Sequence, residues 1–426
     1  MLFQTKLQNL FLFKVFVKLL LLVSFCFAQS GTWTPKASIP TPRCFAGSCE
    51  LNGKIYVIGG SQTISSSLNV MEVYDPVTDT WDTTKRDMPT ARAELCVVAV
   101  SGKIYAIGGA TAHAGSPLGI VEEYDPQTDT WDTNKQPMPT ARMGAACGVF
   151  NNKIYVAGGS PGLNHVPSNK LEIYDPATDN WTSGDTMLAA RYQPQGAVLS
   201  DTFYVIGGLI GSPWTGQPHV QKYDPTSDTW VWGTSLDTGR VGHSADELDN
   251  KIYVIGGDRQ PPILMNVMEY DPQTKAWTVI DTIPSIMIIH SSSVYNNEIY
   301  VFGGNTVSIP NIILTDNVYS YDPWPPGPNS IESKNNLKPY DFALQNNYPN
   351  PFNPRTAIEF SIPKSEFVTL KIYNAVGMEV TTLVSDRLTV GSYHYEWNAS
   401  SLASGVYLYR LQAGEYVETR KMVLLK

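Results

Sequence analysis

Basic charge is scarce in this chain of 426 residues. Lysine and arginine total 30 against 39 acidic residues, which leaves a formal net charge of −9. Nucleic acids and anionic lipid surfaces both require a basic face on a protein partner, so this balance argues against either partner.

Familiar catalytic motifs are also missing. The chain has no Gly-x-Ser-x-Gly nucleophile elbow, no His-Glu-x-x-His zinc motif and no phosphate-binding loop. From the sequence we therefore assign no catalytic residue, no metal ligand and no cofactor.

Long apolar runs are limited to the N-terminus. Three lysines precede an apolar run from Leu19 to Phe27, and Ala28 supplies a small residue before an expected cleavage point. The run is shorter than the roughly 20 apolar residues that cross a bilayer. Residues 1–28 are therefore predicted to be a cleaved secretory signal, and the mature chain is predicted to have no transmembrane span.

Cysteine is rare as well. Cleavage would leave Cys44, Cys49, Cys96 and Cys147 in the mature chain. Export permits disulfides, but the spacing fits no zinc pattern, and three of these residues fall among small residues of expected strands. We interpret them as small buried residues and leave their disulfide state open.

What the chain has in abundance is repetition. The stretch Lys54 to Gly60, with the sequence KIYVIGG, recurs in six copies whose first glycines are 49, 50, 49, 49 and 47 residues apart. Each copy is followed by Tyr-Asp-Pro, and in five copies a tryptophan lies seven residues after that tyrosine. Four short strands in each period of about 50 residues are typical of a propeller blade.

Both faces of the repeated strand are apolar. Ile55 and Val57 point to one side, and Tyr56 and Ile58 point to the other. A strand of this kind must be covered on both sides, so the copies are expected to stack against one another. The predicted fold class is all-β.

The double glycine after an aromatic strand, with tyrosine and tryptophan at fixed distances, resembles the kelch repeat. The resemblance covers about residues 31–326 and implies a six-bladed kelch β-propeller. In the sixth copy, Tyr321-Asp322-Pro323 runs into a proline-rich segment that cannot form a fourth strand. The segment from Trp33 to Pro40 has the tryptophan and the following turn, so we expect it to complete the sixth blade.

The C-terminal part of the chain has a different rhythm. Residues 327–345 are rich in proline, serine and asparagine and are predicted to be a linker. From residue 346 onward, short alternating apolar segments predict a small immunoglobulin-like β-sandwich.

Residues 346–426 resemble the type A C-terminal sorting domain of the type IX secretion system. The matching segments are Asn347 to Pro354, Ser404 to Tyr407 and the final Lys421 to Lys426. The resemblance implies contact with the type IX secretion machinery and export through the periplasm of a Gram-negative-type bacterium to the surface or beyond, with removal of the tail left open. The alternative is an accessory or adhesion module without a sorting role.

One arginine in each of five repeats lies sixteen residues before the first glycine: Arg43, Arg92, Arg142, Arg191 and Arg240. A ring of arginines could bind a carboxylate or an acidic sugar. Alternatively, each arginine could hold its own blade together by hydrogen bonds to local backbone. Repetition at one position of the scaffold favours the second interpretation.

The other candidate residues belong to the expected channel or to its loops. His243 and His290 follow the arginine column by three residues in adjacent blades, where two imidazoles could bind a metal, move a proton or simply line a wet channel. Glu94, Gln193, Gln195 and Asp246 are further candidates for the same channel. Trp214 lies in one of the longest loops, and binding residues tend to sit on long loops of a rigid scaffold.

These features favour non-catalytic recognition of a glycan or of a surface protein by the channel-mouth loops of an exported propeller. A second hypothesis is a sugar-acting enzyme, because six-bladed kelch propellers resemble the sialic acid mutarotase family. A third is a structural scaffold that binds no small ligand.

Overall fold

A computed structural model of the chain describes residues 31–112, 115–211, 215–258, 263–307, 312–323, 342–364, 366–388, 391–400 and 402–425. The expected signal (1–28), most of the expected linker (327–345) and Trp214 lie outside these residues. The chain divides into two units, Met1–Pro328 and Asn329–Lys426, and each is described by itself.

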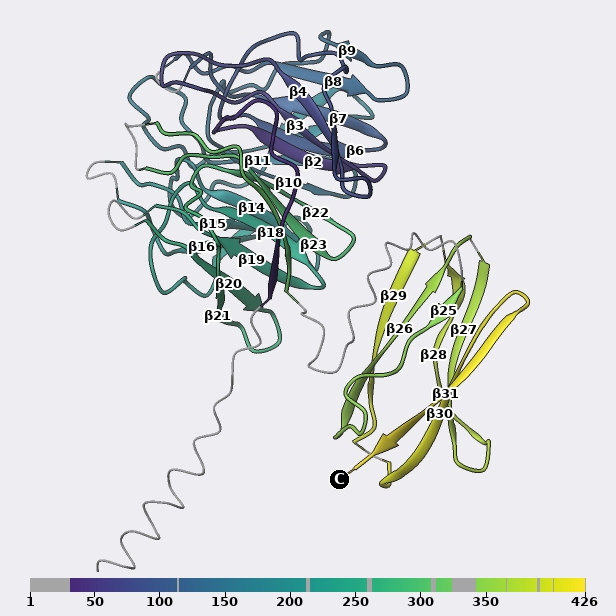
Figure 1. The fold of residues 1–426 in the computed structure, drawn as a ribbon. Helices are drawn as coiled ribbons and strands as arrows, with labels where there is room; N and C mark the ends of the chain where they lie inside the picture. The colour runs from purple at the N-terminus through teal and green to yellow at the C-terminus, as the bar shows by residue number, and fades with distance from the viewer. Residues whose placement is uncertain are drawn as a thin grey trace, which may run out of the picture. The chain divides into compact units, whose positions relative to one another are not determined.

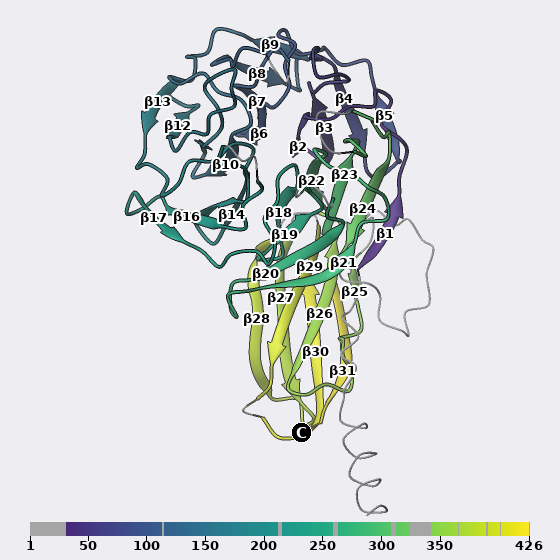
Figure 2. The same ribbon diagram turned by 90° about the vertical axis from the view of Figure 1, so that its left-hand side faces the viewer.

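The first unit consists of six four-stranded antiparallel sheets arranged in a ring (Figures 1 and 2). From the innermost strand outward, the first three blades are β2 (Gly47–Leu51), β3 (Lys54–Ile58), β4 (Met71–Asp75) and β5 (Thr80–Asp82); β6 (Cys96–Val100), β7 (Lys103–Ile107), β8 (Val121–Asp125) and β9 (Thr130–Asp132); and β10 (Ala146–Phe150), β11 (Lys153–Ala157), β12 (Leu171–Asp175) and β13 (Asn180–Ser183). The last three are β14 (Gln195–Leu199), β15 (Thr202–Ile206), β16 (Val220–Asp224) and β17 (Thr229–Trp232); β18 (Ser244–Leu248), β19 (Lys251–Ile255), β20 (Asn266–Asp271) and β21 (Ala276–Thr282); and β22 (Ser291–Tyr295), β23 (Glu298–Phe302), β24 (Val318–Asp322) and β1 (Thr32–Pro35).

The repeated strand is buried on both faces, as its sequence predicts. Val57 of β3 packs in one apolar cluster with Phe302 of the sixth blade. Its neighbour Ile58 packs in another cluster with Ile104 of the second blade. Alternate side chains of one strand therefore bind two different neighbours, which is why the blades must form a continuous ring.

The glycine pair lets the next blade approach the end of this strand. Gly59 and Gly60 have φ values of 67° and 98°. A Cβ on Gly59 would lie 2.6 Å from the carbonyl oxygen of Arg92, and one on Gly60 would lie 2.8 Å from that of Cys44. Only glycine combines this backbone conformation with such close contacts.

The N-terminal strand β1 is the outermost strand of the sixth blade. It pairs antiparallel with β24, where Trp33 lies opposite Tyr321 with 4.5 Å between the ring centroids. Just after β1, the N–H of Ala37 donates to Asp79 at 2.7 Å and its carbonyl accepts from the Trp81 indole at 2.9 Å. The N-terminal segment thus joins the sixth blade to the first.

The same pair of hydrogen bonds recurs around the outer rim. In each of the first four blades, the tyrosine of Tyr-Asp-Pro donates at 2.6–2.7 Å to an aspartate five residues later. That aspartate accepts a backbone N–H of the preceding blade, and the blade's tryptophan donates to the carbonyl of the same residue. The residues held in this way are Ala37, Arg86, Gln136 and Asp185. The regular spacing of tyrosine, aspartate and tryptophan therefore fastens each of these four blades to the blade before it.

The cysteines of the propeller are packed among the inner strands. Cys49, Cys96 and Cys147 lie in β2, β6 and β10, and these three and Cys44 carry free thiols. Burial raises the pKa of the Cys44 thiol to about 12, so this group stays protonated near neutral pH.

The second unit contains two antiparallel sheets. One consists of β25 (Ala343–Leu344), β26 (Arg355–Ile362) and β29 (Gly391–Asn398), and the other of β28 (Glu379–Leu388), β27 (Glu366–Asn374), β30 (Gly405–Ala413) and β31 (Tyr416–Leu424). Both contribute to one apolar core that includes Phe360, Leu370 and Tyr409. The short strand β25 falls within the range that the sequence suggests as linker.

The Asn-Tyr-Pro segment at the start of this unit is fixed by hydrogen bonds. The N–H of Asn347 donates to the Tyr409 hydroxyl at 2.9 Å, and that hydroxyl donates to the carbonyl of Gln345 at 2.8 Å. The Asn347 side chain donates to Thr356 Oγ1 at 2.8 Å. These contacts fix the first residues of the unit to Tyr409 of β30.

Candidate functional site

A ring of six residues in the left-handed conformation surrounds one mouth of the channel. One residue of each blade contributes, with φ between 52° and 63°: Phe45, Glu94, Gly144, Gln193, Gly242 and Ile289. A β-branched residue rarely takes this conformation, so Ile289 (φ 57°) is held there by its surroundings. Such held conformations cluster at ligand sites.

Backbone hydrogen bonds connect the members of this mouth ring. In all members but Gly242, the N–H donates to the carbonyl of the counterpart in the preceding blade, as in Glu94 to Phe45 at 3.0 Å and Gln193 to Gly144 at 2.8 Å. Among the described residues, five of the six possible bonds form, and the pair Gly242 and Gln193 is without one. The shape of the mouth is therefore set by main chain.

The five predicted arginines lie inside the blades, behind the channel wall. Each is at most 2% exposed, and none lines the channel cavity. The Arg92 guanidinium donates to Glu122 at 2.8 Å and to the carbonyl of Ala106 at 2.9 Å, and Arg142 has the equivalent partners. Arg43 pairs with the equivalent glutamate, Glu72, and donates to the carbonyls of Gly59 and Val70. Arg191 and Arg240 donate to carbonyl groups of their own blades. In this position each arginine fastens its turn to the strands beside it.

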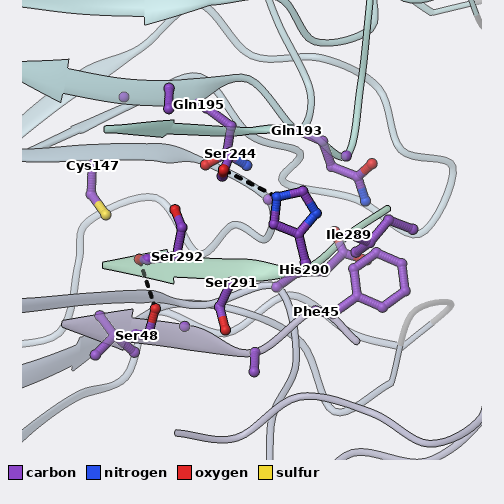
Figure 3. A pocket seen from close by; sticks show the side chains of 18 of the residues that line it. Phe45, Ser48, Cys147, Gln193, Gln195, Ser244, Ile289, His290, Ser291 and Ser292 are labelled. Carbon is purple, nitrogen blue, oxygen red and sulfur yellow. Dashed lines mark hydrogen bonds between the residues drawn. The ribbon is translucent and has the colours of Figure 1, made fainter. Parts of the chain in front are cut away.

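Below the mouth ring, the channel holds a cavity of about 250 Å³ (Figure 3). The residues around it come from all six innermost strands and the turns before them. Six of the predicted candidates lie in its lining: Glu94, Gln193, Gln195, His243, Asp246 and His290.

On the side of blades five, six and one, hydrogen bonds between blades organise the lining. Ser292 Oγ donates to Asp246 at 2.6 Å, and Ser48 Oγ donates to the carbonyl of Ser292 at 2.8 Å. Nε2 of His290 lies 3.0 Å from Ser244 Oγ, and its Nδ1 lies 3.0 Å from the carbonyl of Met287. The contacts of Ser244 with His290 and of Ser48 with Ser292 are visible in Figure 3.

Burial shifts the ionisation of the groups on this side. It raises the pKa of Asp246 to about 6, and the hydrogen bond from Ser292 partly opposes the shift. It lowers the pKa of His290 to about 4 and that of His243 well below its ordinary value. Both imidazoles are therefore neutral near pH 7, whereas the Asp246 carboxyl in the same lining has a pKa close to this range.

On the other side, a hydrogen-bonded network spans blades two and four. The buried Tyr192 hydroxyl donates to Glu94 at 2.6 Å and accepts from Gln193 at 3.2 Å, while His165 stacks on the Tyr192 ring at 4.9 Å. A Cβ on Gly144, which lies between them, would come within 2.7 Å of Tyr192 and 2.9 Å of Glu94. Glycine in the third blade thus lets the fourth blade reach the second.

Sequence reasoning missed Tyr192 and the serines of this lining. Their repeat positions lie one to five residues after the arginine column, where the residue differs from copy to copy. That divergence is the signal that could have pointed to them. Among the described residues, no group of three or more histidine, cysteine or acidic side chains could hold a metal ion. Nor does any described helix have the length and apolar character needed to cross a membrane.

The propeller unit matches the family described as the Attractin/LZTR1 β-propeller, over residues 18–257 and 104–324. The chain belongs to this propeller family. Residues 346–425 match the secretion system C-terminal sorting domain, which points to export by type IX secretion. The predicted kelch-type propeller, the all-β fold class and the sorting domain are therefore confirmed.

Similar proteins share short segments with this propeller. The F-box/kelch-repeat protein SKIP30 of Arabidopsis thaliana is 47% identical over 49 residues, which is 12% of this chain and 14% of that protein. A second F-box/kelch-repeat protein of the same plant is 41% identical over 61 residues, or 14% of this chain and 16% of that protein. The chain thus spans less than a fifth of the length of the curated relatives it matches.

A solved structure described as "Structure of YjhT" resembles the fold over 67% of this chain and 96% of that chain, with a TM-score of 0.56. The sequence identity is 16%, so this likeness concerns the fold alone.

Proposed function

We propose that this chain is an exported recognition protein whose propeller binds a saccharide unit in the channel cavity. One observation carries the proposal: hydroxyls, a carboxyl and imidazoles from several blades converge on one cavity of about 250 Å³. Pockets for small ligands usually occupy about 300–1,000 Å³. The size of this cavity suits one sugar ring better than a long chain.

The proposed contacts follow the polar groups of the lining. Glu94 and Gln193 lie at the mouth, and Asp246, His243 and His290 lie deeper. Held carboxyl and hydroxyl groups suit sugar hydroxyls, which both donate and accept hydrogen bonds. We leave the arginine column out of the binding site, because its members are buried behind the wall.

A glycan array probed with the secreted full chain tests this proposal. We expect binding to a defined terminal sugar. We also expect the double variant Asp246→Asn, Ser292→Ala to weaken it about tenfold or more, since two half-buried hydrogen-bonding groups of the lining are altered. Thr128→Ala, on an exposed turn of the outer rim, is the matched control and should bind like the parent. A folded protein that binds no glycan would overturn the proposal in favour of a protein partner or a scaffold.

The delivery route is part of the proposal. Residues 1–28 would direct the chain to the periplasm of a Gram-negative-type bacterium, and residues 346–426 would pass it to the type IX machinery. Deleting residues 346–426 should leave the propeller in the periplasm, as judged by fractionation and immunoblotting. A truncated protein that still reached the surface would contradict the route.

A sugar-acting enzyme is the second candidate, and a particular pair of groups favours it. Asp246 in blade five has a pKa of about 6, and Glu94 in blade two accepts a hydrogen bond from the Tyr192 hydroxyl. Blades two and five are opposite members of the ring. An acid and a base on two sides of a sugar ring could open and close it, as a mutarotase does. Exchange NMR of anomers would detect this activity, and rates equal to buffer would exclude it.

A further inference from the structure

The wall below the mouth ring is polar on one side of the channel. Blades five, six and one contribute a polar arc, formed by Ser244, Asp246, Ser291, Ser292 and Ser48. Because these blades follow one another around the ring, the arc is continuous. The bonds from Ser292 to Asp246 and from Ser48 to Ser292 hold its side chains in place before any ligand arrives.

The wall opposite blades five and six is apolar, and blade four beside it adds the polar side chain of Gln195. Blades two and three contribute an apolar arc, formed by Leu95, Val97, Val98, Ala145 and Cys147. Val98 and Cys147 are half-buried, so they retain surface toward the channel, whereas Leu95 and Val97 are 8% and 6% exposed. Below Glu94, none of the described lining residues of these two blades has a side chain that forms strong hydrogen bonds.

This division selects a ligand with two unlike edges. A hydroxyl that faced Val98 and Cys147 would lose its water without gaining a side-chain partner, which disfavours binding. A methyl group in the same place would be removed from water, which favours binding. Hydroxyls on the other edge of the ligand would meet groups that are already positioned.

We propose that the ligand of the cavity is a 6-deoxyhexose, with its hydroxyls toward the polar arc and its methyl group toward the apolar arc. This inference rests on the proposed saccharide binding. It names the class of sugar, which the repeat pattern and the family relationship leave open.

Isothermal titration of the secreted full chain with matched sugars provides the test. L-Fucose differs from L-galactose, and L-rhamnose from L-mannose, only by replacement of the 6-hydroxyl with hydrogen. We expect one deoxy sugar to bind roughly five- to fiftyfold more tightly than its partner, because the 6-hydroxyl would be buried unpaired. Val98→Thr and, independently, Cys147→Ser place a hydroxyl in the apolar arc at nearly constant volume. Each should bring this ratio close to one.

The outcomes separate the two proposals. Equal affinity within both pairs, or binding only of sugars without a ring methyl group, would overturn the deoxyhexose assignment and leave saccharide binding intact. Binding of no saccharide at all would overturn both. If the preference existed but neither variant reduced it, the methyl group would not lie at the apolar arc, and the inference would fail. Thermal melts of both variants establish that they are folded before titration.

Discussion

Blades one to three and blades four to six share one backbone plan but pair their buried polar groups differently. In the first three blades each arginine of the column meets a glutamate on the third strand of its own sheet. The equivalent positions on the third strands of blades four and five hold Gln221 and Met268, and blade six has Met287 in place of the arginine. Among the described residues, arginine–glutamate pairs of this column therefore occur only in the first three blades, whereas Arg240 of blade five lies 3.6 Å from the exposed Asp237.

The channel shows the opposite distribution. Blades five and six, with Ser48 of blade one, supply its hydroxyls, imidazoles and poised carboxyl, whereas blades two and three supply most of its aliphatic surface. The comparison teaches that copies of one repeat can keep the same backbone and still differ in where their polar side chains lie, either inside the blade or along the channel. Four changes would break or sharpen this contrast.

Removing an arginine should have its largest effect in the first half. Arg92→Met leaves Glu122 buried without its cation and should lower the free energy of unfolding by about 3–5 kcal/mol. The Arg191 guanidinium donates to the Ala190 carbonyl and forms no ion pair with a described residue. Arg191→Met should therefore lower the free energy of unfolding by only about 1 kcal/mol. Urea denaturation of both variants measures the difference.

The double variant Arg92→Met, Glu122→Met is the control for this prediction, because it removes both charges. It should recover much of the lost stability. Equal losses for Arg92→Met and Arg191→Met would contradict the contrast between the two halves.

A side chain at the mouth should disturb the network between blades two and four. Gly144→Ala would strain a residue at φ 59° and press on Tyr192, which lies 2.7 Å from the new Cβ. Gly102→Ala shares the positive φ but meets nothing within 4 Å, so it reports the strain alone. We expect Gly144→Ala to cost about 1–3 kcal/mol more than Gly102→Ala in thermal or urea unfolding. Equal costs would mean that the third blade has room for a side chain here.

The outer rim offers a smaller contrast. The Trp131 indole donates to the carbonyl of Arg86 at 3.0 Å, whereas the buried Trp33 indole N–H has no partner among the described residues. Trp131→Phe should therefore cost about 1 kcal/mol more than Trp33→Phe, because only the first loses a hydrogen bond. Unfolding midpoints of the two variants test this, and a larger loss for Trp33→Phe would count against it.

The smallest effect concerns the proton of Asp246. Its pKa of about 6 in the fold exceeds its ordinary value of 3.8, so the folded protein binds this proton more tightly than the unfolded chain. The contribution of Asp246 to stability must then fall as the pH rises from about 4 to 6 and stay level above. The hydrogen bond from Ser292 favours the ionised carboxylate, so Ser292→Ala should raise the pKa of Asp246 further. Carbon-detected NMR of the carboxyl gives both values, and a midpoint near 4 would refute the burial argument.

The propeller architecture could be predicted because it depends on residues that recur at the same position of every repeat. Two apolar faces on the Lys54 to Gly60 strand require neighbours on both sides, and the double glycine identifies where the next blade approaches. The same logic suggested Trp33 for the last blade, and in the structure Trp33 lies opposite Tyr321.

The channel could be predicted only in part. Glu94, Gln193 and the two histidines were found by reading the columns after each arginine, but their partners come from other blades. Ser292 reaches Asp246 across 46 residues, and Tyr192 reaches Glu94 across 98 residues by passing a glycine in the blade between them. Such pairings depend on how closely the blades approach at the axis, which no local pattern of the sequence specifies.

The mouth ring has a consequence for how this protein can change over time. Because five main-chain bonds, all running in the same direction around the axis, hold the ring, its outline does not depend on the side chains it carries. Phe45, Glu94, Gln193 and Ile289 can each be exchanged without loss of those bonds. The main chain at the entrance therefore stays the same while its side chains can vary. Related chains could acquire new ligands in this way, one substitution at a time.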